Sequence, residues 1–101
     1  MKGYWKYYQV IRTLREKCHS RYPVVIRRVE MSDCWGECYF DEDKKKFIIH
    51  IDKNMSQDYA IDTVLHEIAH IFTYKKRQLH GKDWGIAYSR IYRIFEKEFL
   101  S

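Results

Sequence analysis

Apolar residues near the start of the chain recur every three or four positions. This spacing favours an amphipathic helix, because such residues then share one face, and here they are Tyr4, Tyr7, Tyr8, Ile11, Leu14 and Cys18. Pro23 follows where the helix should stop, since proline lacks the amide hydrogen that a helix interior needs. The pattern therefore predicts a helix from Tyr4 to about Tyr22.

Three stretches rich in β-branched and aromatic residues follow, and they indicate β-strands. They are "VVIRRVEM" (24–31), "CWGECYF" (34–40) and "KFIIHID" (46–52), and a charged hairpin turn, "DEDKKK", joins the last two. Gly36 inside the second stretch suggests a β-bulge, because glycine weakens a regular strand. We expect a small and mostly antiparallel sheet.

Helical spacing returns after Ser56, a favourable N-cap residue, and Asp58 in the first turn suits the helix dipole. This helix is expected to run to about Lys75. A third helix follows Gly81 and carries apolar residues at Trp84, Ala87, Tyr88, Ile91, Ile94 and Phe95. The order α-β-β-β-α-α, without repeats or linkers, predicts a single α+β domain over residues 1–101.

The second helix contains the stretch "LHEIAHIF", residues 65–72, in which polar groups lie among core residues. His66 and His70 are four apart, so their imidazoles lie on one helix face and can point at one ion. Glu67 is rotated by roughly 100° around the axis, which keeps its carboxylate beside that point. This spacing is that of H-E-x-x-H zinc hydrolases, with two histidine ligands and a glutamate as general base.

A catalytic zinc takes a third protein ligand and leaves a fourth position open. The metzincin pattern would need glycine and histidine where the chain has Thr73 and Lys76, so that subclass is excluded. A glutamate from a later helix, Glu96 or Glu98, is one alternative. His80 is the better candidate, because four extended residues span ~13 Å and can lead back over the ~9 Å of helix beyond His70.

Several residues near this motif have candidate supporting roles. Tyr88 or Arg90 in the third helix could donate a hydrogen bond to the oxygen that becomes charged during hydrolysis, although packing or surface roles compete. Asp62 or Asp83 could orient an imidazole, as outer partners of metal ligands do. Trp84 is periodic with the apolar face of its helix, so we interpret it as a core anchor.

Other histidines and cysteines are expected to be structural or exposed. Cys34 and Cys38 have C-x3-C spacing, which lacks the two-residue knuckle of common zinc sites, so a second site with Cys18 and His19 is the weaker interpretation. His50 is expected at a surface or strand edge.

Composition narrows the class of protein. The chain is 46% hydrophobic with one proline, which excludes a disordered segment. It shows no apolar run long enough to cross a membrane and no secretory signal, and its three cysteines are an odd count. These features predict a cytoplasmic protein with reduced thiols. The net charge of +5 permits an acidic partner such as DNA.

The motif "LHEIAH", followed after a short basic loop by "HGKDWGIAYSRIY", resembles the SprT-like zinc metallopeptidase domain, especially the short proteins of phage genomes. The resemblance extends from about Cys34 to Tyr92 and implies a compact zincin-like fold. It also implies that His66, His70 and His80 bind Zn²⁺. Glu67 corresponds to the catalytic glutamate.

One departure from this family concerns the C-terminal zinc ribbon with paired C-x-x-C elements that many SprT-type proteins carry. This chain has no cysteine after Cys38.

The expected function is therefore a zinc-dependent peptidase that hydrolyses peptide bonds with a Glu-activated, zinc-bound water. The substrate is expected to be a protein, met near DNA, because SprT-like enzymes are linked to proteins attached to DNA. The alternative is a non-catalytic, zinc-stabilised module that binds nucleic acid through the basic tracts at 27–28, 44–46 and 75–77. Glu67 favours the enzyme, since a structural zinc site needs no carboxylate there. A small amide as substrate is a third possibility.

Overall fold

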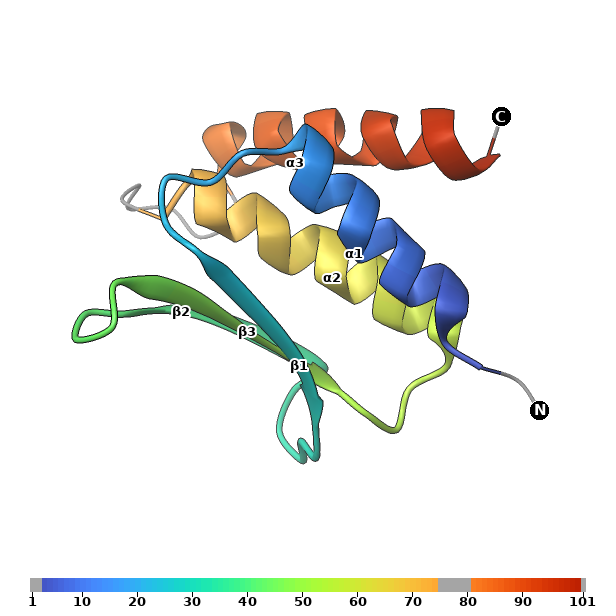
Figure 1. The fold of residues 1–101 in the computed structure, drawn as a ribbon, viewed down its shortest axis with the longest axis horizontal. Coiled ribbons are helices and arrows are strands. Elements are labelled where there is room, and N and C mark those ends of the chain that lie inside the picture. Colours follow the sequence, from blue (N-terminus) through green and yellow to red (C-terminus); the bar gives the residue numbers. More distant parts are fainter. Residues whose placement is uncertain (1–2, 75–80, 101) are drawn as a thin grey trace.

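The computed structural model describes residues 3–74 and 81–100 (Figure 1). Its elements are α1 (Trp5–Lys17), β1 (Val24–Val29), β2 (Gly36–Asp41), β3 (Lys46–Asp52), α2 (Gln57–Phe72) and α3 (Lys82–Phe95), followed by the π-helical turn η1 (Glu96–Leu100). The predicted α+β class and the order α-β-β-β-α-α are confirmed.

The helix boundaries follow local backbone signals. Helix α1 ends at Lys17, earlier than the expected Tyr22, because Cys18 is already extended at φ −118° and ψ 105°. Helix α2 begins as predicted, since the Ser56 side chain accepts a hydrogen bond from the backbone N–H of Tyr59. It ends at Phe72, before the expected Lys75.

The sheet has the strand order β1-β3-β2. β2 and β3 form the predicted antiparallel hairpin, whereas β1 pairs with β3 in parallel. The expectation of a mostly antiparallel sheet is therefore right for one of the two pairings. After β1 the chain crosses to the opposite edge of the sheet, where β2 lies. β3 then occupies the position between the two edge strands and runs parallel to β1.

All three helices lie on one face of the sheet, and α2 lies between the sheet and α3 (Figure 1). Side chains of α1, β3 and α2 fill the space between these layers, and the most deeply buried are Tyr7, Val10, Ile49, Ile51, Val64 and Leu65. Each such aliphatic side chain contributes about 1.5–3 kcal/mol on burial. The helix that carries the His-Glu-x-x-His motif is therefore held on both sides.

In the part of the chain that the structure describes, no helix combines the length and the apolar character needed to span a membrane.

Candidate active site

The two histidines of the motif point toward one another from successive turns of α2. Their Nε2 atoms lie 3.3 Å apart, and their ring centroids are separated by 4.9 Å with a 72° angle between the planes. Two nitrogens at 2.0–2.1 Å from a tetrahedral zinc ion are separated by about 3.3–3.4 Å. The pair formed by His66 and His70 therefore fits zinc in both donor type and spacing.

The predicted third ligand, His80, lies outside the described residues, so its role stays a prediction. Among residues 3–74 and 81–100, no three His, Cys, Asp or Glu side chains gather in a way that could hold a metal ion.

Helix α3 supplies aromatic rings that pack on the histidine pair. The Trp84 ring lies 4.9 Å from the His66 ring and 5.7 Å from the His70 ring, measured between centroids. Tyr88 stacks on Trp84 at 5.1 Å with an 11° interplanar angle. Trp84 is half-buried against the core, as predicted, and it also restricts the orientations of the two imidazoles.

Glu67 lies in the narrow space between α2 and β2. Its side chain is buried, with 7% of its surface exposed. A Cβ atom built on Gly36 would come within 2.7 Å of the Thr63 methyl carbon and 3.3 Å of the Glu67 Oε2. Gly36 therefore allows the close approach of strand and helix. The expected β-bulge is wrong, since the register from Gly36 to Asp41 is uninterrupted.

This confinement changes the acidity of nearby groups. Burial, with a smaller contribution from the charge of Glu37, raises the pKa of the Glu67 carboxyl from 4.5 to about 7. Burial and the charge of Glu67 raise the pKa of the Cys38 thiol to about 12, so this thiol keeps its proton at neutral pH. A carboxyl with a pKa near 7 is suited to act as a general base at neutral pH.

The raised pKa of Glu67 predicts a pH dependence of stability for protein stripped of metal by a chelator. Between pH 4.5 and about 7 the unfolded state releases the carboxyl proton while the folded state keeps it. The free energy of unfolding should therefore fall as the pH rises through this range, by about 1–3 kcal/mol. Glu67→Gln should abolish this fall and be the more stable protein at pH 8, as measured by urea unfolding at pH 5, 6, 7 and 8.

Glu16→Gln makes the same chemical change at an exposed position of α1, and it should keep the wild-type pH dependence. A Glu67→Gln protein that still lost stability between pH 5 and 7 as the wild type does would show that another group causes the effect.

A hollow of about 420 Å³ opens beside the motif. Its walls come from the start of β2, one face of α2 and the middle of α3, and its lining residues are Trp35, Gly36, Tyr59, Asp62, Thr63, His66, Glu67 and Tyr88. Four of these residues, Trp35, Gly36, Tyr59 and Thr63, have no site role predicted from the sequence. Tyr59 stands eight residues before Glu67 on the same helix face, so its spacing could have indicated it. Trp35 reaches the hollow through tertiary packing, for which the sequence gives no local signal.

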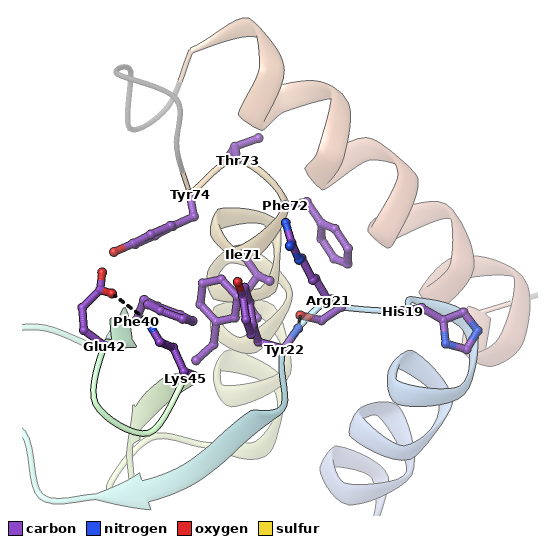
Figure 2. A pocket seen from close by; sticks show the side chains of 12 residues that line it. His19, Arg21, Tyr22, Phe40, Glu42, Lys45, Ile71, Phe72, Thr73 and Tyr74 are labelled. Atoms are coloured by element: carbon purple, nitrogen blue, oxygen red, sulfur yellow. Dashed lines mark hydrogen bonds and ion pairs between the residues drawn. The ribbon is translucent and has the colours of Figure 1, made fainter.

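A second hollow, of about 560 Å³, lies near the C-terminal end of α2 and contains none of the motif residues (Figure 2). The rings of Tyr22, Phe40, Phe47 and Tyr74 surround it, with centroids 4.9–6.3 Å apart. It is larger than the hollow beside the motif, but its described lining residues include a single histidine, His19, and no pair of imidazoles beside a glutamate. We therefore assign the candidate site to the smaller hollow.

Some of the remaining candidate site residues line the hollow, and others lie away from it. Asp62 and Tyr88 line the hollow, whereas Arg90 is exposed and does not. Glu96 stands twelve residues after Trp84, about 18 Å along the helical segment, which makes it a poor third ligand. Glu98 pairs with Lys17 at 3.5 Å.

The other cysteines and histidines take the structural roles expected of them. Cys18, Cys34 and Cys38 are free thiols, of which Cys34 is exposed and the other two are half-buried. His50 Nδ1 lies 2.7 Å from Glu37 Oε2 across neighbouring strands. The basic residues Lys75 to Arg77 lie outside the described residues, so DNA binding through them stays a prediction.

A His-Glu-x-x-His helix packed on a small sheet, with its glutamate buried beside the histidine pair, defines a metallopeptidase-type domain. The chain belongs to the SprT-like family, whose model matches residues 7–99. This membership confirms the resemblance seen in the sequence and supports a metallopeptidase-type function. No curated protein matches the chain. Among solved structures, the chain is similar to the metallopeptidase zymogen jannalysin of Methanocaldococcus jannaschii, at 18% identity and a TM-score of 0.49, over 98% of this chain and 100% of that one.

Proposed function

We propose that the chain is a zinc-dependent peptidase that cleaves proteins or peptides. The observation that carries this proposal is the 3.3 Å separation of the His66 and His70 Nε2 atoms beside the buried carboxylate of Glu67. The proposal is tested by cleavage of an unfolded protein by zinc-loaded enzyme. Cleavage should stop after chelation and return when zinc is added back.

In this proposal His66, His70 and His80 hold the zinc ion. When bound, zinc supplies a Lewis acid that polarises the substrate carbonyl and lowers the pKa of water to about 7. Glu67 accepts a proton from the attacking water and passes it to the leaving amine. Confinement between α2 and β2 fixes the position of its carboxylate, so little orientational freedom is lost during the reaction.

The edge of the sheet offers a place for the substrate backbone. β2 is an edge strand, and the carbonyl of Trp35 accepts a hydrogen bond of 2.9 Å from the N–H of Asp52 on the inner side. Backbone groups alternate in direction along a strand, so those of Gly36 and Cys38 point away from β3. An extended peptide that pairs with this edge would pass directly over the hollow beside Glu67.

Tyr88 is the best candidate in α3 to stabilise the charge that develops on the substrate oxygen. Burial, followed by the charge of Asp62, raises the pKa of its hydroxyl, which therefore stays protonated and can donate. Tyr88→Phe should lower kcat about 100-fold with little change in KM or zinc content, because only the transition state loses a hydrogen bond.

Steady-state kinetics on a peptide substrate measure this effect. The matched control is Tyr92→Phe, which removes a hydroxyl one turn further along α3 and should retain wild-type kcat. A wild-type kcat in Tyr88→Phe would leave Tyr88 with a packing role only.

A nucleic-acid-binding module with structural zinc accounts less well for the site. A structural site gains nothing from burying a carboxylate, and burial makes this one difficult to ionise. Among its described lining residues, the hollow has Asp62 and Glu67 but no lysine or arginine. A phosphate backbone is bound by such cations, so a polypeptide is the better occupant.

A further inference from the structure

Two large aromatic side chains stand exposed at the rim of the hollow beside Glu67. Trp35 has 68% of its surface exposed and Tyr59 has 63%, and their ring centroids lie 6.3 Å apart at an interplanar angle of 47°. They line both the hollow beside the motif and a neighbouring one of about 550 Å³. We name these two residues the rim pair. Neighbouring exposed rings on a cleft wall are typical of a surface that becomes covered by a ligand.

The backbone beneath each ring of the rim pair is fixed. The carbonyl of Trp35 accepts a hydrogen bond from the N–H of Asp52, which continues the β2–β3 ladder by one residue. Tyr59 lies in the first turn of α2, and its carbonyl accepts a hydrogen bond of 2.7 Å from the Thr63 hydroxyl. The rings therefore project from rigid elements, so a ligand would bind them at a small cost in backbone ordering.

The distance between the rim pair and the catalytic groups is that of a few residues of extended peptide. Tyr59, Thr63 and Glu67 are spaced four apart on one face of α2, which puts Tyr59 about 12 Å along the helix from Glu67. Trp35 directly precedes Gly36, which lies against Glu67. Because an extended chain advances about 3.3–3.6 Å per residue, the pair is two to four residues from the bond that is cleaved.

The charges around the rim pair favour an uncharged ring as its ligand. Asp62 and Glu67 line the first hollow and Asp52 lines the second. Among the described residues that line these two hollows, none is a lysine or arginine. A stacked nucleobase would bring its phosphate toward these carboxylates, whereas an aromatic side chain of a peptide carries no such charge.

We infer that the rim pair is a substrate subsite that binds an aromatic side chain two to four residues from the cleaved bond. This inference rests on the proposed peptidase function and adds a sequence preference to it. The two rings and the incoming ring stack or meet edge to face, an interaction of about 0.5–1.5 kcal/mol beyond the area that they bury. The enzyme should therefore select unfolded segments rich in aromatic residues.

The test uses alanine-based peptides with a single phenylalanine moved along the chain, compared with the same peptide without it. For the wild type, kcat/KM should rise about 10-fold when phenylalanine lies two to four residues from the cleaved bond on one side. Trp35→Ala and Tyr59→Ala should each lose most of this preference while they still cleave the peptide without phenylalanine. Trp5→Ala is the matched control, because Trp5 is 67% exposed on α1 and does not line either hollow.

A binding assay separates this inference from the proposed function. Fluorescence anisotropy of the labelled peptides is measured on Glu67→Gln with and without the additional Trp35→Ala change, so that no turnover is needed. Tighter binding of the phenylalanine peptide that disappears with Trp35→Ala supports the subsite even if no peptide is cleaved. Cleavage with equal kcat/KM for both peptides, or a preference retained in both rim variants, would overturn the inference and leave the peptidase function standing.

Discussion

Glu67→Gln is expected to lose most turnover while it keeps both zinc and fold. The carboxamide has nearly the shape of the carboxylate, so it fits the space between α2 and β2 that Gly36 leaves open. It cannot accept a proton from the attacking water, and loss of a general base typically costs 10²–10⁴-fold in rate. We therefore expect kcat to fall by about that factor on an unfolded protein substrate.

Zinc content by elemental analysis and circular dichroism of the same preparations check that only the chemistry has changed. Glu16→Gln, on the exposed side of α1, is the control for the loss of one carboxylate and should retain full activity. Equal turnover in Glu67→Gln and wild type would contradict the role of Glu67 as base. Turnover in neither protein would instead leave the zinc to serve the fold alone, as in the alternative of a structural module.

The histidine pair and the helix that carries it were predictable because both depend on local spacing. Residues four apart on a helix share a face in any tertiary context, so the convergence of His66 and His70 follows from the pattern itself. The Ser56 cap is equally local, since its side chain bonds to a backbone N–H only three residues away. Such features need no knowledge of what packs against the helix.

The direction of β1 relative to β3 and the contact between Trp35 and Tyr59 were not predictable from local spacing. Alternation of side chains shows which face of a strand is buried, but it does not reveal whether the neighbouring strand is parallel. Trp35 and Tyr59 meet only because β2 packs beside the first turns of α2. Gly36 suggests a bulge when only the sequence is considered, because the sequence does not show that a helix packs against the position of its missing side chain.

We expect the largest effect on metal binding when one of the three predicted histidine ligands is replaced by alanine. His66→Ala, His70→Ala and His80→Ala should each reduce zinc affinity by more than about 100-fold, because even an outer partner of a metal ligand is typically worth 10–100-fold. Wild-type protein should contain one zinc ion per chain after dialysis, and each variant should contain almost none. Zinc should also raise the melting temperature of the wild type and not of the variants, since a ligand that binds only the folded state stabilises it.

The remaining histidines provide matched controls for this loss of zinc. His50 pairs with Glu37 across the sheet and His19 lines the second hollow, so His50→Ala and His19→Ala should each retain one zinc ion per chain. The decisive comparison is between His80→Ala and Glu96→Ala. Full zinc in His80→Ala together with its loss in Glu96→Ala or Glu98→Ala would show that α3 supplies the third ligand from its far end. That result would contradict the helical spacing, which places Glu96 about 18 Å along the helical segment from Trp84, the residue that packs on the histidine pair.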